Sequence, residues 1–142
     1  MNKYLIVALS TLVICQVIKF IIESFRDRKF IIKRLLNGSG GMPSSHSALT
    51  SSLTSFILLS EGGNSPLFAI SLVFTMIVLY DSVNVRRESE LHAYAINKLV
   101  DSLNKGNDYD KLNEEIGHEV FEVVAGVTLG ILTSLLFYYI VF

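Results

Sequence analysis

Long apolar stretches constrain this chain more than any other feature of its sequence. A transmembrane helix needs about 20 mostly apolar residues, and we find four candidates: Tyr4 to Glu23, Ser45 to Leu59, Pro66 to Val83, and Val120 to Phe142. The second is short and rich in serine, so it could instead be a buried or re-entrant segment that leans on the others. The sequence therefore predicts an all-α, multi-pass membrane helix bundle of about four spans.

Composition agrees with a chain embedded in a membrane. Hydrophobic residues make up 51% of the 142 residues and charged residues only 18%, while the formal net charge is −1. That balance offers no basic excess for nucleic acid, so we expect no nucleic-acid partner. The single cysteine, Cys15, cannot form an intramolecular disulfide. We expect one domain over residues 1–142.

The basic residues of the first loop predict the orientation. Five lysines and arginines lie between Arg26 and Arg34, opposed only by Asp27. Cytoplasmic loops carry such an excess, so we place this loop inside, in an integral protein of the cytoplasmic membrane. With four alternating spans, the polar stretch from Asn84 to Gly117 is also cytoplasmic. Apolar residues at helical spacing within it predict an amphipathic helix near the membrane surface: Leu91, Ala95, Ile96, Leu99 and Leu103.

A lysine interrupts the first apolar stretch. A charged side chain is costly near the bilayer centre, so Lys19 needs a compensating interaction. Glu23 could pair with it four residues on, or Lys19 could reach the lipid headgroups. Arg26 follows two helical turns after Lys19, so both cations can project from one helix face. Two such donors suit a phosphate group.

A glycine-rich segment leads into the second apolar stretch. It runs from Gly38 to Ser47 through Pro43, Ser44 and Ser45, and it carries His46. Helix N-termini offer unpaired N–H groups and a partial positive charge, and serine hydroxyls can add donors. The alternative is a helix that is simply capped by a serine. Because an imidazole gains little structurally at a helix start, we select Ser44, Ser45 and His46 as candidate site residues.

Two further groups of polar residues lie at helix ends. His118 and Glu122 are one helical turn apart, so the carboxylate can hold one imidazole nitrogen protonated and leave the other as nucleophile or base. Alternatively, Glu122 satisfies the helix macrodipole and His118 is a surface residue. Asp81 ends the third apolar stretch and is followed by Arg86 and Arg87, which could anchor the helix or close a phosphate site.

The predicted topology gathers these residues on one side of the membrane, although about a hundred residues of sequence separate them. The residues expected at cytoplasmic helix ends are Lys19, Arg26, His46, Arg86, His118 and Glu122. This convergence follows from hydropathy and loop charge, without reference to any motif.

Three motifs carry a family resemblance. Lys19-x6-Arg26, Pro43-Ser44-Ser45-His46 and His118-x3-Glu122 resemble the signatures of the type 2 phosphatidic acid phosphatases, which are related to vanadium haloperoxidases. The chain is most similar to the short divergent branch of that superfamily, through Gly-Gly-Met-Pro-Ser-Ser-His-Ser, Tyr-Asp-x4-Arg-Arg and Gly-His-Glu-Val-Phe-Glu-Val. The resemblance implies a metal-independent phosphatase without a cofactor. The expected cytoplasmic site favours lipid phosphates of the inner leaflet as substrates, such as phosphatidylglycerophosphate or phosphatidic acid.

The resemblance also implies roles for the site residues. His118 would attack phosphorus to form a phosphohistidine, Glu122 would orient His118, and His46 would protonate the leaving oxygen. Water would then release phosphate. Lys19, Arg26 and the serines Ser44 and Ser45 would bind the phosphoryl oxygens, since charge stabilisation is most of what phosphoryl transfer requires of a protein.

The sequence departs from the family pattern at several positions. Asp27 replaces the usual proline, Ser45 a glycine and Glu122 an aspartate. The largest departure is Leu112, which stands six residues before the proposed nucleophile, where the third motif has an arginine. Our hypothesis is that Arg86 or Arg87 supplies the missing guanidinium.

Alternative assignments remain open. The usual family core has six membrane helices, so a homodimer is one way for this shorter chain to enclose its site. Gly126-x3-Gly130 offers a close-packing face, although we favour its use within one subunit.

A catalytically silent protein that binds lipid phosphate is the main functional alternative. A metal site formed by His46, Asp81, His118 and Glu122 is disfavoured because nearby cations would repel the metal.

Overall fold

The computed structural model describes residues 2–27, 41–103, 110–114 and 117–141. The basic loop from Arg28 to Arg34 and the glycine-rich residues 38–40 lie outside the described residues, as do the side chains of Glu23, Arg26 and Asp27. The described residues form helices and no strands. The helices are α1 (Lys3–Asp27), α3 (Ser45–Glu61), α4 (Pro66–Val83), α5 (Val85–Leu103), α6 (Val120–Leu136) and a final π-helical turn η1 (Phe137–Val141).

Three helical stretches of the described chain are long and apolar enough to cross a membrane. They are Lys3–Ile22, a window within Pro66–Leu103, and Val120–Val141. The 17 residues of α3 extend only roughly 25 Å, less than the apolar thickness of about 30 Å. The predicted stretch from Ser45 to Leu59 is therefore helical but is not one of these candidate spans. The all-helical membrane bundle that the sequence predicts is confirmed.

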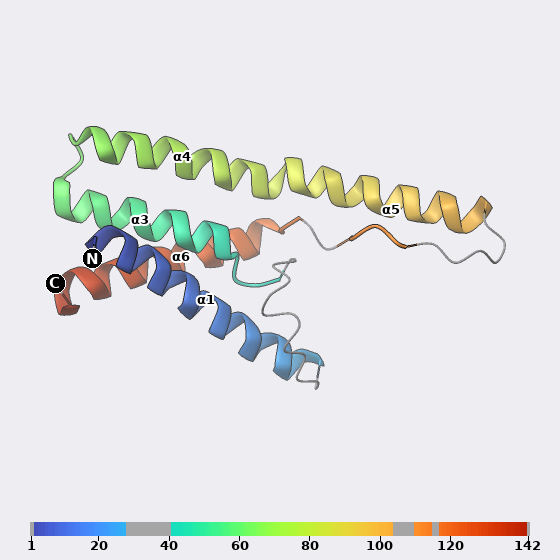
Figure 1. The fold of residues 1–142 in the computed structure, drawn as a ribbon, viewed down its shortest axis with the longest axis horizontal. Helices are drawn as coiled ribbons and strands as arrows, with labels where there is room; N and C mark the ends of the chain where they lie inside the picture. The colour runs from blue at the N-terminus through green and yellow to red at the C-terminus, as the bar shows by residue number, and fades with distance from the viewer. Residues whose placement is uncertain (1, 28–40, 104–109, 115–116, 142) are drawn as a thin grey trace.

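Helix α3 is the central helix of the bundle. It packs on α1, α4 and α6, which surround it in Figure 1. Because these neighbours are protein rather than lipid, its many hydroxyl groups can form hydrogen bonds between helices. The Thr54 hydroxyl lies 2.8 Å from that of Thr75 and donates to the Ser71 carbonyl at 3.0 Å. The serine-rich composition of this segment thus reflects helix packing on several sides.

Two glycines allow α6 to approach α3 closely. A Cβ atom at Gly126 would lie 2.5 Å from the carbonyl oxygen of Ser44, and one at Gly130 would lie 2.6 Å from that of Ala48. Any larger residue would push the two backbones apart. The Gly126-x3-Gly130 face is therefore used within the subunit, as we favoured, and it brings the first turn of α6 beside the first turn of α3.

Helix α5 extends the molecule beyond the bundle. It follows α4 after Asn84 and continues in nearly the same direction past the ends of α3 and α6 (Figure 1). The amphipathic helix expected from the sequence is present. Its direction differs from our expectation, because a membrane-spanning α4 points α5 away from the bilayer rather than along its surface. Residues 110–114 then lie beside α5 on the way to α6.

Candidate functional site

His118 is held just before α6 and points into the protein. Only 6% of its surface is exposed, which contradicts the interpretation of a surface histidine. Its Nδ1 lies 2.9 Å from Oε2 of Glu122. An ionised carboxylate can only accept, so this contact suits the tautomer of the imidazole in which Nδ1 carries the proton. The backbone N–H of His118 also donates to the carbonyl of Ser82 at 3.3 Å.

Glu122 has a second role at the start of α6. It forms a capping box with Glu119, in which the Glu119 N–H donates to Oε2 of Glu122 at 3.2 Å. One carboxylate therefore satisfies the helix terminus and contacts the imidazole of His118. Both roles considered from the sequence occur together, and the capping bonds restrict the rotation of the carboxylate.

The start of α3 is fixed by Ser44. This fully buried residue caps the helix, its hydroxyl lies 2.9 Å from that of Ser47, and its backbone N–H donates to the carbonyl of Glu122 at 3.0 Å. Ser45 is also buried, with the Sγ of Cys15 at 3.9 Å from its hydroxyl. The capping alternative is thus observed. Ser44 holds the two helix starts together and leaves His46 exposed on the first turn of α3.

Charged groups from several segments act on His46. Arg86, His118, Asp81 and Lys19 all lie near enough to act on its imidazole electrostatically. Lys19 is only 6% exposed, so its ammonium is enclosed within the bundle rather than extended toward headgroups. Arg26 lies in the last turns of α1, but its side chain is outside the described residues. The fold thus brings Lys19, His46, Arg86 and His118 together, as the sequence predicts.

The two adjacent arginines have different partners. Arg86 Nε lies 2.6 Å from Oδ2 of Asp81, and Arg86 is one of the charges that act on His46. Arg87 Nη1 lies 2.6 Å from Oε1 of Glu90, on α5. Of the two candidates for the missing guanidinium, Arg86 is therefore the one whose charge acts on His46.

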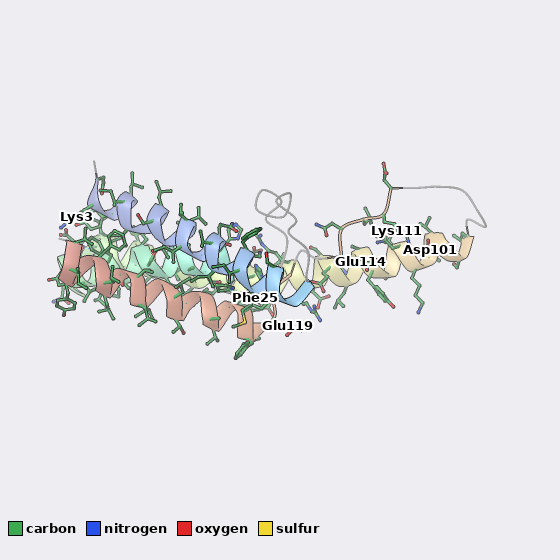
Figure 2. The ribbon with its side chains drawn as sticks, turned by 90° about the horizontal axis from the view of Figure 1, so that it is seen from below. Lys3, Phe25, Asp101, Lys111, Glu114 and Glu119 are labelled. Carbon is green, nitrogen blue, oxygen red and sulfur yellow. The ribbon has the colours of Figure 1, made fainter. Side chains whose placement is uncertain are left out.

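Leu112, which occupies the position of the missing third-motif arginine, lies beside α5. Asn97 donates to the Leu112 carbonyl and accepts from the Leu112 N–H, both at 2.9 Å, and it also donates to Glu114 at 2.7 Å. Figure 2 shows Glu114 and Lys111 beside α5 near Asp101, well beyond the bundle. Sequence reasoning missed Glu90 and Asn97. Glu90 had a weak signal in its spacing of three from Arg87, and Asn97 had none.

Apolar residues line a groove beside the candidate site. Its volume is about 420 Å³, and α1 contributes Ile18 and Ile22 while α6 contributes Phe121 and Leu132. Pro43, directly before Ser44, also lines it, so the groove begins next to the polar residues and continues along the apolar helices.

Within the described part of the chain, no three histidine, cysteine or acidic residues are grouped so that they could hold a metal ion. The alternative ligand set of His46, Asp81, His118 and Glu122 is therefore not assembled there.

Comparison with known proteins identifies the family. The model of the Divergent PAP2 family matches residues 1–133. The chain belongs to this family. A relative in Bacillus subtilis (strain 168), named "Uncharacterized membrane protein YuiD", is 36% identical over 151 residues that cover 97% of this chain and 95% of the relative. No solved structure matches the chain. The family resemblance carried by the three motifs is thus confirmed.

Proposed function

We propose that this Divergent PAP2 protein is a phosphatase that hydrolyses the phosphomonoester of a membrane lipid. One observation carries the proposal: four separate segments bring Lys19, His46, Arg86 and the His118–Glu122 pair to one end of the bundle. Several cationic groups beside two imidazoles suit a phosphate dianion, and a phosphatase relationship is what the family's description suggests.

The arrangement supports a two-step reaction. In the first step Nε2 of His118 attacks phosphorus, the bond to the lipid oxygen breaks, and protonated His46 gives its proton to that oxygen. In the second step a water molecule, deprotonated by His46, attacks the phosphohistidine and releases inorganic phosphate. Lys19 and Arg86 would stabilise the charge on the phosphoryl oxygens. In this scheme Arg86 replaces the arginine that the third motif lacks at Leu112.

A lipid substrate agrees with the surroundings of the site. The groove along α1 and α6 is lined by apolar residues such as Ile18 and Phe121, and it starts beside Pro43. Acyl chains could lie there while the headgroup phosphate reaches the histidines. The basic loop from Arg26 to Arg34 favours a cytoplasmic site, which fits lipids of the inner leaflet such as phosphatidic acid or phosphatidylglycerophosphate.

Phosphate release by the purified protein tests the proposal. Phosphatidic acid in detergent micelles is supplied without added metal and with a chelator. We expect release by the wild type, a loss of at least about a thousandfold in His118→Ala, and a large loss in His46→Ala. His92→Ala, which changes an exposed histidine of α5, is the matched control and should retain full activity. Equal release by wild type and His118→Ala would contradict the mechanism.

Binding of lipid phosphate without turnover is the second candidate function. The observation that favours it is the placement of Leu112, which Asn97 holds along α5 where the family pattern has an arginine. Under this alternative, the wild type would bind vesicles that contain phosphatidic acid but release no phosphate. His118→Ala would then bind these vesicles as strongly as the wild type does.

A further inference from the structure

Gly117, the residue before His118, is attached to α5 by a hydrogen bond to Glu90. Glu90 forms this attachment through one carboxylate oxygen, while its other oxygen pairs with Arg87 on the same helix. Oε1 pairs with Nη1 of Arg87 at 2.6 Å, and Oε2 accepts the N–H of Gly117 at 3.1 Å. The Glu90 side chain is 20% exposed, less than half the value for Arg87. A carboxylate that is largely shielded and bonded at both oxygens holds its backbone partner more firmly than an exposed one.

The contact at Gly117 is too close for any other residue. A Cβ atom there would lie 2.8 Å from the Cα of Arg87 and 2.8 Å from Oε2 of Glu90. The backbone of Gly117 is therefore pressed directly against α5. This close approach places the residue next to His118 at a defined point on the helix.

Asn97 forms a second attachment, further along α5. Its amide is bonded to both backbone groups of Leu112 and to the carboxylate of Glu114, and the residue is only 3% exposed. A buried amide with satisfied donors and acceptor is a rigid connection, because breaking one bond leaves a buried polar group without a partner. Leu112 and Glu114 are thus held against α5.

His118 itself lies outside α6. The helix begins at Val120, so the position of the His118 backbone depends on contacts from other segments. Ser82, near the end of α4, accepts its N–H, and α5 holds the preceding residue through Glu90. The hydrogen bond of 2.9 Å to Glu122 requires that this backbone stay in place relative to α6.

We infer that α5 positions His118, and that Glu90 and Asn97 are positioning residues which hold the incoming chain so that the imidazole meets Glu122. They act through the backbone and do not touch the substrate. The consequence for catalysis rests on the proposed phosphatase function, whereas the effect on the imidazole does not. Helix α5, which projects beyond the bundle (Figure 1), is thereby connected mechanically to the candidate nucleophile.

The first test observes the imidazole directly. Nitrogen NMR of histidine-labelled full-length protein in detergent reports which ring nitrogen carries the proton, and a His118→Gln spectrum assigns the signal. We expect the Nδ1–H form of His118 in the wild type, because Glu122 accepts that proton. Glu90→Ala and Asn97→Ala should shift the His118 signal toward that of a free imidazole, in which both neutral tautomers are populated. Glu88→Ala, at an exposed glutamate on the same helix, is the matched control and should leave it unchanged.

The second test separates positioning from loss of folding. Glu90→Gln keeps an oxygen that can accept the Gly117 N–H but loses the ion pair with Arg87, so it should recover much of the wild-type signal. In the phosphatase assay, Glu90→Ala should lower kcat by about tenfold to a hundredfold, as expected for a displaced catalytic group. KM should stay within about twofold, because Lys19 lies on α1 and Arg86 pairs with Asp81 rather than with Glu90.

Several results would overturn the inference. A His118 signal in folded Glu90→Ala identical to that of the wild type would do so, as would an equal shift in Glu88→Ala. If Glu90→Ala does not fold, an unaltered kcat and His118 signal in folded Asn97→Ala would also reject it. A wild type that releases no phosphate would reject the proposed function, while the NMR result would still decide whether α5 positions His118.

Discussion

The two ends of the helix bundle contain different chemistry. At the site end, Lys19, His46, Arg86 and His118 come together from separate segments. At the opposite end, where Figure 1 places both termini, aromatic rings pack edge to face. Phe56 lies 5.7 Å from Tyr4 and 6.3 Å from Tyr138 between ring centroids. The hydroxyl of Tyr4 donates to Glu61, and the ammonium of Lys3 lies 5.2 Å from the centre of the Tyr4 ring.

The cations at the two ends have different surroundings. Lys3 is exposed and lies over aromatic rings, which is typical of an anchor at a membrane interface. Lys19, on the same helix, is buried. At its end of the bundle Arg86 pairs with Asp81 and His118 contacts Glu122, so cationic and acidic groups occur together. The aromatic end thus offers ring contacts, whereas the site end gathers the ionisable groups on which the proposed function rests.

Substitution of Arg86 should produce the largest contrast between the ends. Arg86→Ala is expected to lower kcat/KM for phosphatidic acid about a hundredfold, because it removes a cation that stabilises charge in the transition state. Arg86→Lys should recover only part of this loss, since an ammonium lacks the planar fork of donors. Lys3→Ala, at the aromatic end, should match the wild type in the same assay. Wild-type activity in Arg86→Ala would show that Arg86 does not take part in the reaction.

A smaller effect is expected where α6 meets α3 near the site. Gly126→Ala forces a Cβ atom to within 2.5 Å of the Ser44 carbonyl and should lower the free energy of unfolding by about 1–3 kcal/mol. At the aromatic end, Gly63→Ala brings its Cβ only into ordinary contact with Leu58 at 3.7 Å. Thermal unfolding in detergent compares the two variants. Equal melting temperatures for both variants and the wild type would mean that the close approach of α6 to α3 is not required.

The smallest effect is expected at Tyr4. Tyr4→Phe removes the hydroxyl that donates to Glu61 while keeping the ring contact with Phe56. The free energy of unfolding should fall by about 1 kcal/mol or less, the usual net value of one hydrogen bond. Phosphate release should remain at the wild-type rate. A loss of turnover in a stably folded Tyr4→Phe protein would show that the two ends of the bundle are coupled and do not act independently.

Local patterns in the sequence predicted much of the fold and part of the site. Apolar length predicted the helices α1, α4 and α6, because a membrane span needs an uninterrupted run of apolar residues. A spacing of four, read as one turn of a helix, predicted that His118 would reach Glu122. The contact forms, but His118 precedes α6 and its backbone is held by Ser82 instead. The central place of α3 was not evident, because 17 residues rich in serine have no distinctive pattern until neighbouring helices surround them.

The arginines show where sequence reasoning ended. Arg86 and Arg87 are adjacent in sequence, but successive side chains of a helix point about 100° apart, so one pairs with Asp81 and the other with Glu90. Which of them lies beside His46 depends on the direction in which α4 enters α5. The roles of Glu90 and Asn97 also depend on tertiary structure. They bond Gly117 and Leu112, and no local sequence pattern specifies that these residues come back to lie against α5.

By itself, then, the sequence determined a membrane-embedded helical chain with a histidine–carboxylate pair and cations at helix ends, because hydropathy and residue spacing act over short distances. The tertiary structure decided that α3 is enclosed, that Arg86 lies near His46, and that Glu90 of α5 holds Gly117 next to His118. These features arise from contacts between residues distant in the chain, and such contacts exist only once the helices have packed.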